Sequence, residues 1–207
     1  MKKKFIVITL ITLMTISVVG TAFAQEGSFK ILYTNKIEDE SQLKKNDGLE
    51  FNQVKDKIKK YQNNSNVKEL EKMANFNFLA ANLQPQLVDS YIIKEVDGIK
   101  VGIFGLVTPT TIEKTHADNI KGLTFRDPYQ TAAEMVAELS SQTDIIVVLS
   151  HLGTDKNSEY NSQDLARGIS GIDIIIDGQS RGDIENSKLI DGTFIAQAGQ
   201  YDRNIGM

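Results

Sequence analysis

Five consecutive apolar residues, most of them β-branched, form the clearest pattern in the chain. The run from Ile145 to Leu149 is too short to span a membrane and too continuous for a strand with one wet face. It predicts a central sheet strand that is covered on both faces. The polar turn from Ser150 to Gly153 follows directly and contains His151, at the strand end where open α/β sheets present ligands and catalytic groups. A histidine at such a place can also simply hydrogen-bond a neighbouring loop.

Other apolar segments predict alternating strands and amphipathic helices. Asp97-Gly98 separates two such segments, 91–96 and 99–106, and predicts a tight hairpin turn with positive φ at both central positions. Asp127 followed by Pro128 predicts the capped start of a helix that ends near Leu139. Further strands are predicted at 29–34, 76–82, 172–177, 193–198 and 204–207, and further helices at 48–62, 67–74 and 162–168. This alternation indicates an α/β protein.

The first 24 residues have the three parts of a secretory signal peptide. Three lysines precede an apolar run from Phe5 to Val19, and Ala22-Phe23-Ala24 forms a small-x-small cleavage pattern. We expect export, cleavage before Gln25, and no membrane span afterwards. An uncleaved anchor is the alternative, but the run is short for a bilayer. Residues 25–207 should then form one domain, because they contain no internal repeat and no low-complexity linker.

Net charge and cysteine content limit the binding partners and the metal ligands that the chain can use. The formal net charge is −4, and it becomes −7 when the three lysines of the signal peptide are removed. An acidic exported chain is poorly suited to binding nucleic acid or an anionic membrane. Because the chain has no cysteine, any metal must be bound by His, Asp, Glu or Asn. Only two histidines are present, His151 and His116, and we expect His116 to lie on a surface loop.

The order of the segments resembles the amino-terminal catalytic domain of the secreted 5′-nucleotidases, a branch of the calcineurin-like metallophosphoesterases. The matching stretches are ILYTN at 31–35, DGLEFNQVKDKIKKY at 47–61, ANFNFLAANL at 74–83, VDGIKVGIFGLVTPTT at 96–111, GLTFRDPYQTAAEMVAEL at 122–139, DIIVVLSHLGTD at 144–155, GIDIIIDGQSR at 171–181 and IAQAGQYDRNIG at 195–206. The resemblance implies a four-layer α/β/β/α sandwich of two mixed sheets. It also implies a site for two divalent metals on loops at one edge, which would clamp a phosphate group.

Two motifs that supply metal ligands in that family are changed in this chain. Thr-Asn-Asp-x-His-Gly corresponds to residues 34–39, where Asn35 is followed by Lys36 and the later positions hold Glu38 and Asp39. Lys36 brings a positive charge to a cation site. Asp-Gly-His-Ser-His corresponds to residues 177–181, where Asp177 is kept and the two histidines are replaced by Gln179 and Arg181. Glutamine is a weak neutral ligand, and an arginine guanidinium is always protonated and cannot ligate.

Of the remaining three family motifs, two are missing from this chain and one is intact. Gly-Asp and Gly-Asn-His-Glu should lie between the predicted helix that ends at residue 62 and the predicted strand at 76, but the connection is too short to hold them. We therefore expect the sandwich to lack one strand. Ser-His-Leu-Gly is intact at 150–153, so His151 stands where the family has a metal ligand.

Four functional hypotheses follow. The leading one is a secreted 5′-nucleotidase-like pseudoenzyme that keeps the scaffold and lacks competent dinuclear phosphatase activity. The second is a residual metal-dependent phosphomonoesterase acting on nucleotides, with one Mn²⁺, Zn²⁺ or Mg²⁺ ion held by Glu38, Asp39, Asp177 and His151. The third is a metal-free module that binds a nucleotide or another phosphate or anion through Lys36 and Arg181. The last is a decaying product without a selected role.

Overall fold

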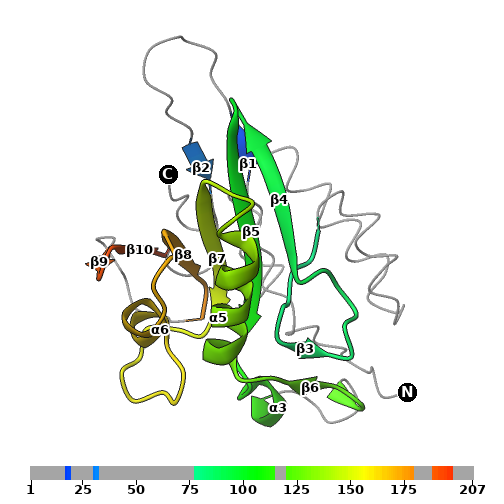
Figure 1. The fold of residues 1–207 in the computed structure, drawn as a ribbon. Coiled ribbons are helices and arrows are strands. Elements are labelled where there is room, and N and C mark those ends of the chain that lie inside the picture. Colours follow the sequence, from blue (N-terminus) through cyan, green and yellow to red (C-terminus); the bar gives the residue numbers. More distant parts are fainter. Residues whose placement is uncertain (1–16, 20–29, 33–76, 115–119, 180–187, 198–207) are drawn as a thin grey trace, which may run out of the picture.

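A six-stranded mixed sheet forms the centre of the computed structural model, which describes residues 17–19, 30–32, 77–114, 120–179 and 188–197. The strand order is β4-β5-β7-β8-β10-β9 (Figure 1). The strands are β4 (Tyr91–Val96), β5 (Ile99–Val107), β7 (Ile145–His151), β8 (Ile174–Asp177), β9 (Lys188–Ile190) and β10 (Thr193–Ala196). The four inner strands are parallel, and the two edge strands run antiparallel to their neighbours. The α/β class predicted from the sequence is confirmed, with one main mixed sheet in the described residues.

Two small sheets and three helices complete the described structure. The antiparallel pairs are β1 (Ser17–Val19) with β2 (Lys30–Leu32), and β3 (Leu83–Gln84) with β6 (Thr124–Phe125). The helices are α3 (Thr111–Lys114), α5 (Pro128–Leu139) and α6 (Ser162–Gly168). No helix among the described residues is long and apolar enough to cross a membrane.

Strand β7 has the buried, central position that its apolar run predicts. Ile146 and Val148 point into a core that α5 and α6 share through Leu139 and Leu165. On the opposite face, Val147 belongs to a second apolar cluster, with Val101, Ile103 and Ile176. Because both faces are covered by apolar contacts, the strand carries no polar side chain until Ser150.

The local turn and cap predictions are also confirmed. The hairpin between β4 and β5 turns at Asp97 and Gly98, whose φ angles are 51° and 84°. Helix α5 begins after Asp127, whose carboxylate accepts the backbone N–H groups of Tyr129 and Gln130, both at 2.8 Å. Each feature depends on a few neighbouring residues, which is why the sequence pattern was sufficient to predict it.

One strand prediction is wrong. Residues 77–82 do not form a strand, and Leu79 makes only an isolated bridge with Asp89. The segment instead passes over the end of β5, where the Ala81 N–H donates to the Gly105 carbonyl at 2.8 Å. Gly105 permits this approach because a Cβ there would lie 2.1 Å from the carbonyl oxygen of Leu79.

Other predictions differ in extent or fall outside the described residues. The strands predicted at 172–177 and 193–198 are observed as Ile174–Asp177 and Thr193–Ala196. The predicted helices at 48–62 and 67–74, the predicted strand at 204–207 and His116 lie outside the described ranges.

Candidate functional site

The parallel strands β5, β7 and β8 end side by side, at the lower edge of the sheet in Figure 1. Val107 pairs with His151, and Ser150 pairs with Asp177, so three strand ends meet in register. This is the edge at which α/β sheets place ligand-binding groups. The structure therefore brings His151, Asp177 and Gln179 to neighbouring strand ends.

Asp177 is enclosed at this edge, with an exposed fraction of 0%. Its Oδ2 accepts hydrogen bonds from the Ser162 hydroxyl at 2.5 Å and the Gly153 N–H at 2.9 Å, and its Oδ1 accepts the Gln179 N–H at 3.2 Å. Burial raises the pKa of the Asp177 carboxyl above its ordinary value, and these hydrogen bonds act in the opposite direction. The carboxylate is thus used to join the loop after β7, the start of α6 and the end of β8.

The segment from Ser150 to Gly153, which contains the end of β7 and the turn after it, is held by further contacts around this carboxylate. The hydroxyls of Ser150 and Ser162 lie 2.8 Å apart, and the Ser150 hydroxyl accepts the Leu152 N–H at 3.2 Å. The Ser162 N–H donates to the Gly153 carbonyl at 2.7 Å. Leu152 is 2% exposed and packs in the main core. His151, the last residue of β7, therefore lies between two anchored residues, Ser150 and Gly153.

Gln179 also contacts this segment. With its amide nitrogen turned toward the backbone, the side chain donates to the carbonyl oxygens of His151 at 2.8 Å and Leu152 at 2.9 Å. The Gln179 side chain thus makes a contact between the ends of β8 and β7.

Asn82 is a site-edge residue that the sequence reasoning did not identify. It is fully buried, and its side-chain amide pairs with both backbone groups of Val107, donating to the carbonyl at 2.8 Å and accepting the N–H at 3.0 Å. The same amide donates to the Arg126 carbonyl at 3.1 Å. A single buried asparagine in the apolar stretch 78–83 was the signal that could have indicated it.

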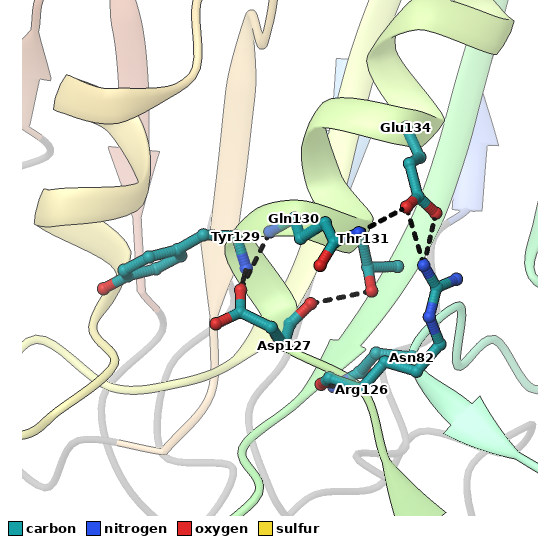
Figure 2. A network of polar contacts seen from close by, with 7 residues as sticks. All are labelled: Asn82, Arg126, Asp127, Tyr129, Gln130, Thr131 and Glu134. Carbon is teal, nitrogen blue, oxygen red and sulfur yellow. Dashed lines mark hydrogen bonds and ion pairs between the residues drawn. The ribbon is translucent and has the colours of Figure 1, made fainter.

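Figure 2 shows how this corner continues toward α5. The Arg126 guanidinium contacts both carboxylate oxygens of Glu134, at 2.6 and 2.7 Å, and holds the pKa of that carboxyl below its ordinary value. Thr131 donates to the backbone carbonyl of Asp127 at 2.8 Å. The pair between Arg126 and Glu134 is exposed to solvent, so it adds little to the rigidity of the edge.

The described residues do not fit a dinuclear metal centre. Within the described ranges, no three His, Asp or Glu side chains gather in an arrangement that could hold a metal ion. The remaining predicted site residues, Asn35, Lys36, Glu38, Asp39 and Arg181, lie outside those ranges.

Comparisons with known proteins confirm the resemblance to the metallophosphoesterase region of nucleotidases. The chain is 30% identical over 134 residues to the trifunctional nucleotide phosphoesterase protein YfkN of Bacillus subtilis, covering 62% of this chain and 9% of that protein. It is 29% identical over 164 residues to a 5′-nucleotidase of Vibrio cholerae, covering 64% of this chain and 30% of that protein. A cell wall protein of Listeria monocytogenes is 40% identical over 80 residues, which cover 37% of this chain and 10% of that protein. No protein-family model matches the chain.

A solved structure supports the same fold. The putative 5′-nucleotidase of Staphylococcus aureus, in complex with alpha-ketoglutarate, superposes with a TM-score of 0.60 at 24% identity. The match covers 67% of this chain and 30% of that one. The described mixed sheet is therefore similar to the sheet of a metallophosphoesterase domain, and the chain spans less than a third of the length of YfkN, of the Vibrio cholerae 5′-nucleotidase and of the Staphylococcus aureus protein.

Proposed function

We propose that this protein is an exported 5′-nucleotidase-like protein that keeps the metallophosphoesterase scaffold and has no competent dinuclear phosphatase activity. The observation that carries the proposal is the use of the polar groups at the strand ends. The Asp177 carboxylate accepts three hydrogen bonds from the protein, and the Gln179 amide is directed at backbone carbonyls. A dinuclear centre needs several anionic or imidazole ligands that face a common ion.

The sequence supports the proposal at the positions outside the described ranges. Lys36 and Arg181 stand where the family motifs have ligands, and each adds a positive charge that repels a cation. Neither side chain can replace a carboxylate or an imidazole at neutral pH. The four changes are Lys36, the absence of the second and third motifs, Gln179 and Arg181. Together they favour loss of the dinuclear centre over a rearranged one.

We also propose the full architecture and location. Residues 1–24 act as a signal peptide, and residues 25–207 form one four-layer domain of two mixed sheets that lacks one strand. The supporting observations are the tripartite leader, the mixed sheet with helices against one face, and the similarity to a cell wall protein. On this proposal the protein acts outside the cytoplasm.

A phosphatase assay tests the main proposal. Purified protein is incubated with AMP and, in separate reactions, with Mn²⁺, Zn²⁺ or Mg²⁺, and the released phosphate is compared with that from His151→Ala. The Vibrio cholerae 5′-nucleotidase, measured in parallel, shows that the assay detects activity. We expect the protein and the variant to release phosphate equally slowly. Release well above the His151→Ala level would refute the proposal.

Metal and anion binding distinguish the two alternatives. A residual phosphomonoesterase requires Asp177 to ligate a metal with His151, Glu38 and Asp39, and saturable metal binding by calorimetry would favour it. An anion-binding module requires Lys36 and Arg181, and it predicts that phosphate raises the Tm. In that case Lys36→Glu with Arg181→Glu must abolish the rise in Tm.

A further inference from the structure

We infer that Asp177 is a positioning residue, which fixes the segment from Ser150 to Gly153, including His151, and does not itself face a ligand. The inference rests on the proposed function only in taking this strand edge as the site. It assigns to Asp177 a role different from that of the aspartate ligand expected in a residual metal centre.

The first argument is the direction of the carboxylate contacts. Oδ2 accepts hydrogen bonds from the Gly153 N–H, at the end of this segment, and from the Ser162 hydroxyl, on α6, and Oδ1 accepts the Gln179 N–H. With an exposed fraction of 0%, the carboxylate has no surface left for a ligand from solvent. Its contacts all serve to hold protein segments together.

The second argument is that Asp177 is connected to both ends of the segment from Ser150 to Gly153. Asp177 binds Gly153 directly, and it reaches Ser150 through the Ser162 hydroxyl, which lies 2.8 Å from the Ser150 hydroxyl. His151 and Leu152 lie between these two anchored residues. Leu152 is held in the core and the His151 backbone is paired with Val107 in the sheet, so the His151 side chain is the group whose orientation we infer this network to control.

The same strand provides a matched control at its other end. Asp173 directly precedes β8, and its Oδ2 accepts the Ile146 N–H at 2.7 Å. Like Asp177, it is an aspartate that accepts a backbone N–H from a neighbouring segment. It is exposed and lies at the other end of β8 from Asp177, away from the sheet edge that holds His151.

The two histidines of the chain allow a direct measurement. In a ¹H–¹⁵N spectrum of the imidazole nitrogens, at one fixed pH and without metal, His151→Ala identifies the His151 resonances. We expect Asp177→Asn to move them by more than a linewidth, since one amide oxygen cannot accept all three hydrogen bonds. The His116 resonances should stay in place, and Asp173→Asn should move neither set. A purely structural role would lower Tm and leave the His151 resonances unchanged.

A second variant covers the possibility that Asp177→Asn does not fold. Ser162→Ala keeps the carboxylate and removes the hydroxyl that connects it to Ser150, so it too should move the His151 resonances. Unchanged His151 resonances in folded Asp177→Asn, or in Ser162→Ala if only that variant folds, would overturn the inference. The spectrum needs no substrate, so its outcome is separate from the phosphatase assay that tests the proposed function.

Discussion

The two ends of the parallel strands use aspartate in different ways. At the amino end, Asp144 and Asp173 each directly precede a strand and stay exposed. Each forms two hydrogen bonds with one residue of the neighbouring strand, Lys100 for Asp144 and Ile146 for Asp173. The carboxylate accepts that residue's N–H, and the backbone N–H of the aspartate donates to its carbonyl. At the carboxyl end, Asp177 is enclosed and binds three separate segments.

The difference teaches what each end requires. An exposed carboxylate keeps most of its hydration, so its pairing with one N–H contributes about 1 kcal/mol or less. An enclosed carboxylate loses that hydration and is stable only when several donors replace water. At the amino end, each aspartate therefore only bonds one residue of the neighbouring strand. At the carboxyl end, the hydrogen bonds of Asp177 form a network whose parts depend on one another.

The largest expected effect comes from removing the two kinds of carboxylate. Asp177→Ala should lower the free energy of unfolding by about 3 kcal/mol, because it leaves buried donors without an acceptor. Asp173→Ala should lower it by about 1 kcal/mol or less, because water can replace the lost carboxylate. Urea unfolding at pH 7 measures both. Equal losses in the two variants would break the distinction between the two ends.

A pair of glycines on β5 sharpens the comparison. An alanine Cβ at Gly105 would lie 2.1 Å from the Leu79 carbonyl oxygen, and at Gly102 it would lie 3.0 Å from the Thr143 methyl. Backbone must shift in the first case and a side chain in the second, so Gly105→Ala should cost about 2 kcal/mol and Gly102→Ala about 1 kcal/mol. Thermal unfolding of the two variants tests this order. A greater loss for Gly102→Ala would show that the backbone around Leu79 can shift to accommodate a Cβ at position 105.

These contrasts also explain what the sequence could predict. The hairpin turn at Asp97-Gly98 and the cap at Asp127 depend on neighbouring residues, and both were predicted correctly. The path of residues 77–82 depends on the missing Cβ of Gly105, more than twenty residues away in the chain, and it was predicted wrongly. For Asp177, the sequence gives the strand end but not the direction of the carboxylate. An aspartate at this strand end could act as a metal ligand or hold a neighbouring segment by hydrogen bonds, and the sequence is the same in both cases.

The smallest expected effect is a pH dependence that arises at the carboxyl end. Burial raises the pKa of Asp177 in the folded protein above its ordinary value of 3.8. At pH values between the ordinary and the raised pKa, the folded protein therefore binds more protons than the unfolded chain. The stability of the wild type relative to Asp177→Asn should therefore be greatest below about pH 4 and fall as pH rises through the raised pKa. The slope should not exceed about 1.4 kcal/mol per pH unit, the limit for one proton. Urea unfolding of both proteins across this range measures the difference, and Asp177→Ala, which also lacks the titrating group, must give the same direction. A relative stability that increases with pH would mean that the three hydrogen bonds outweigh burial in setting the pKa of Asp177.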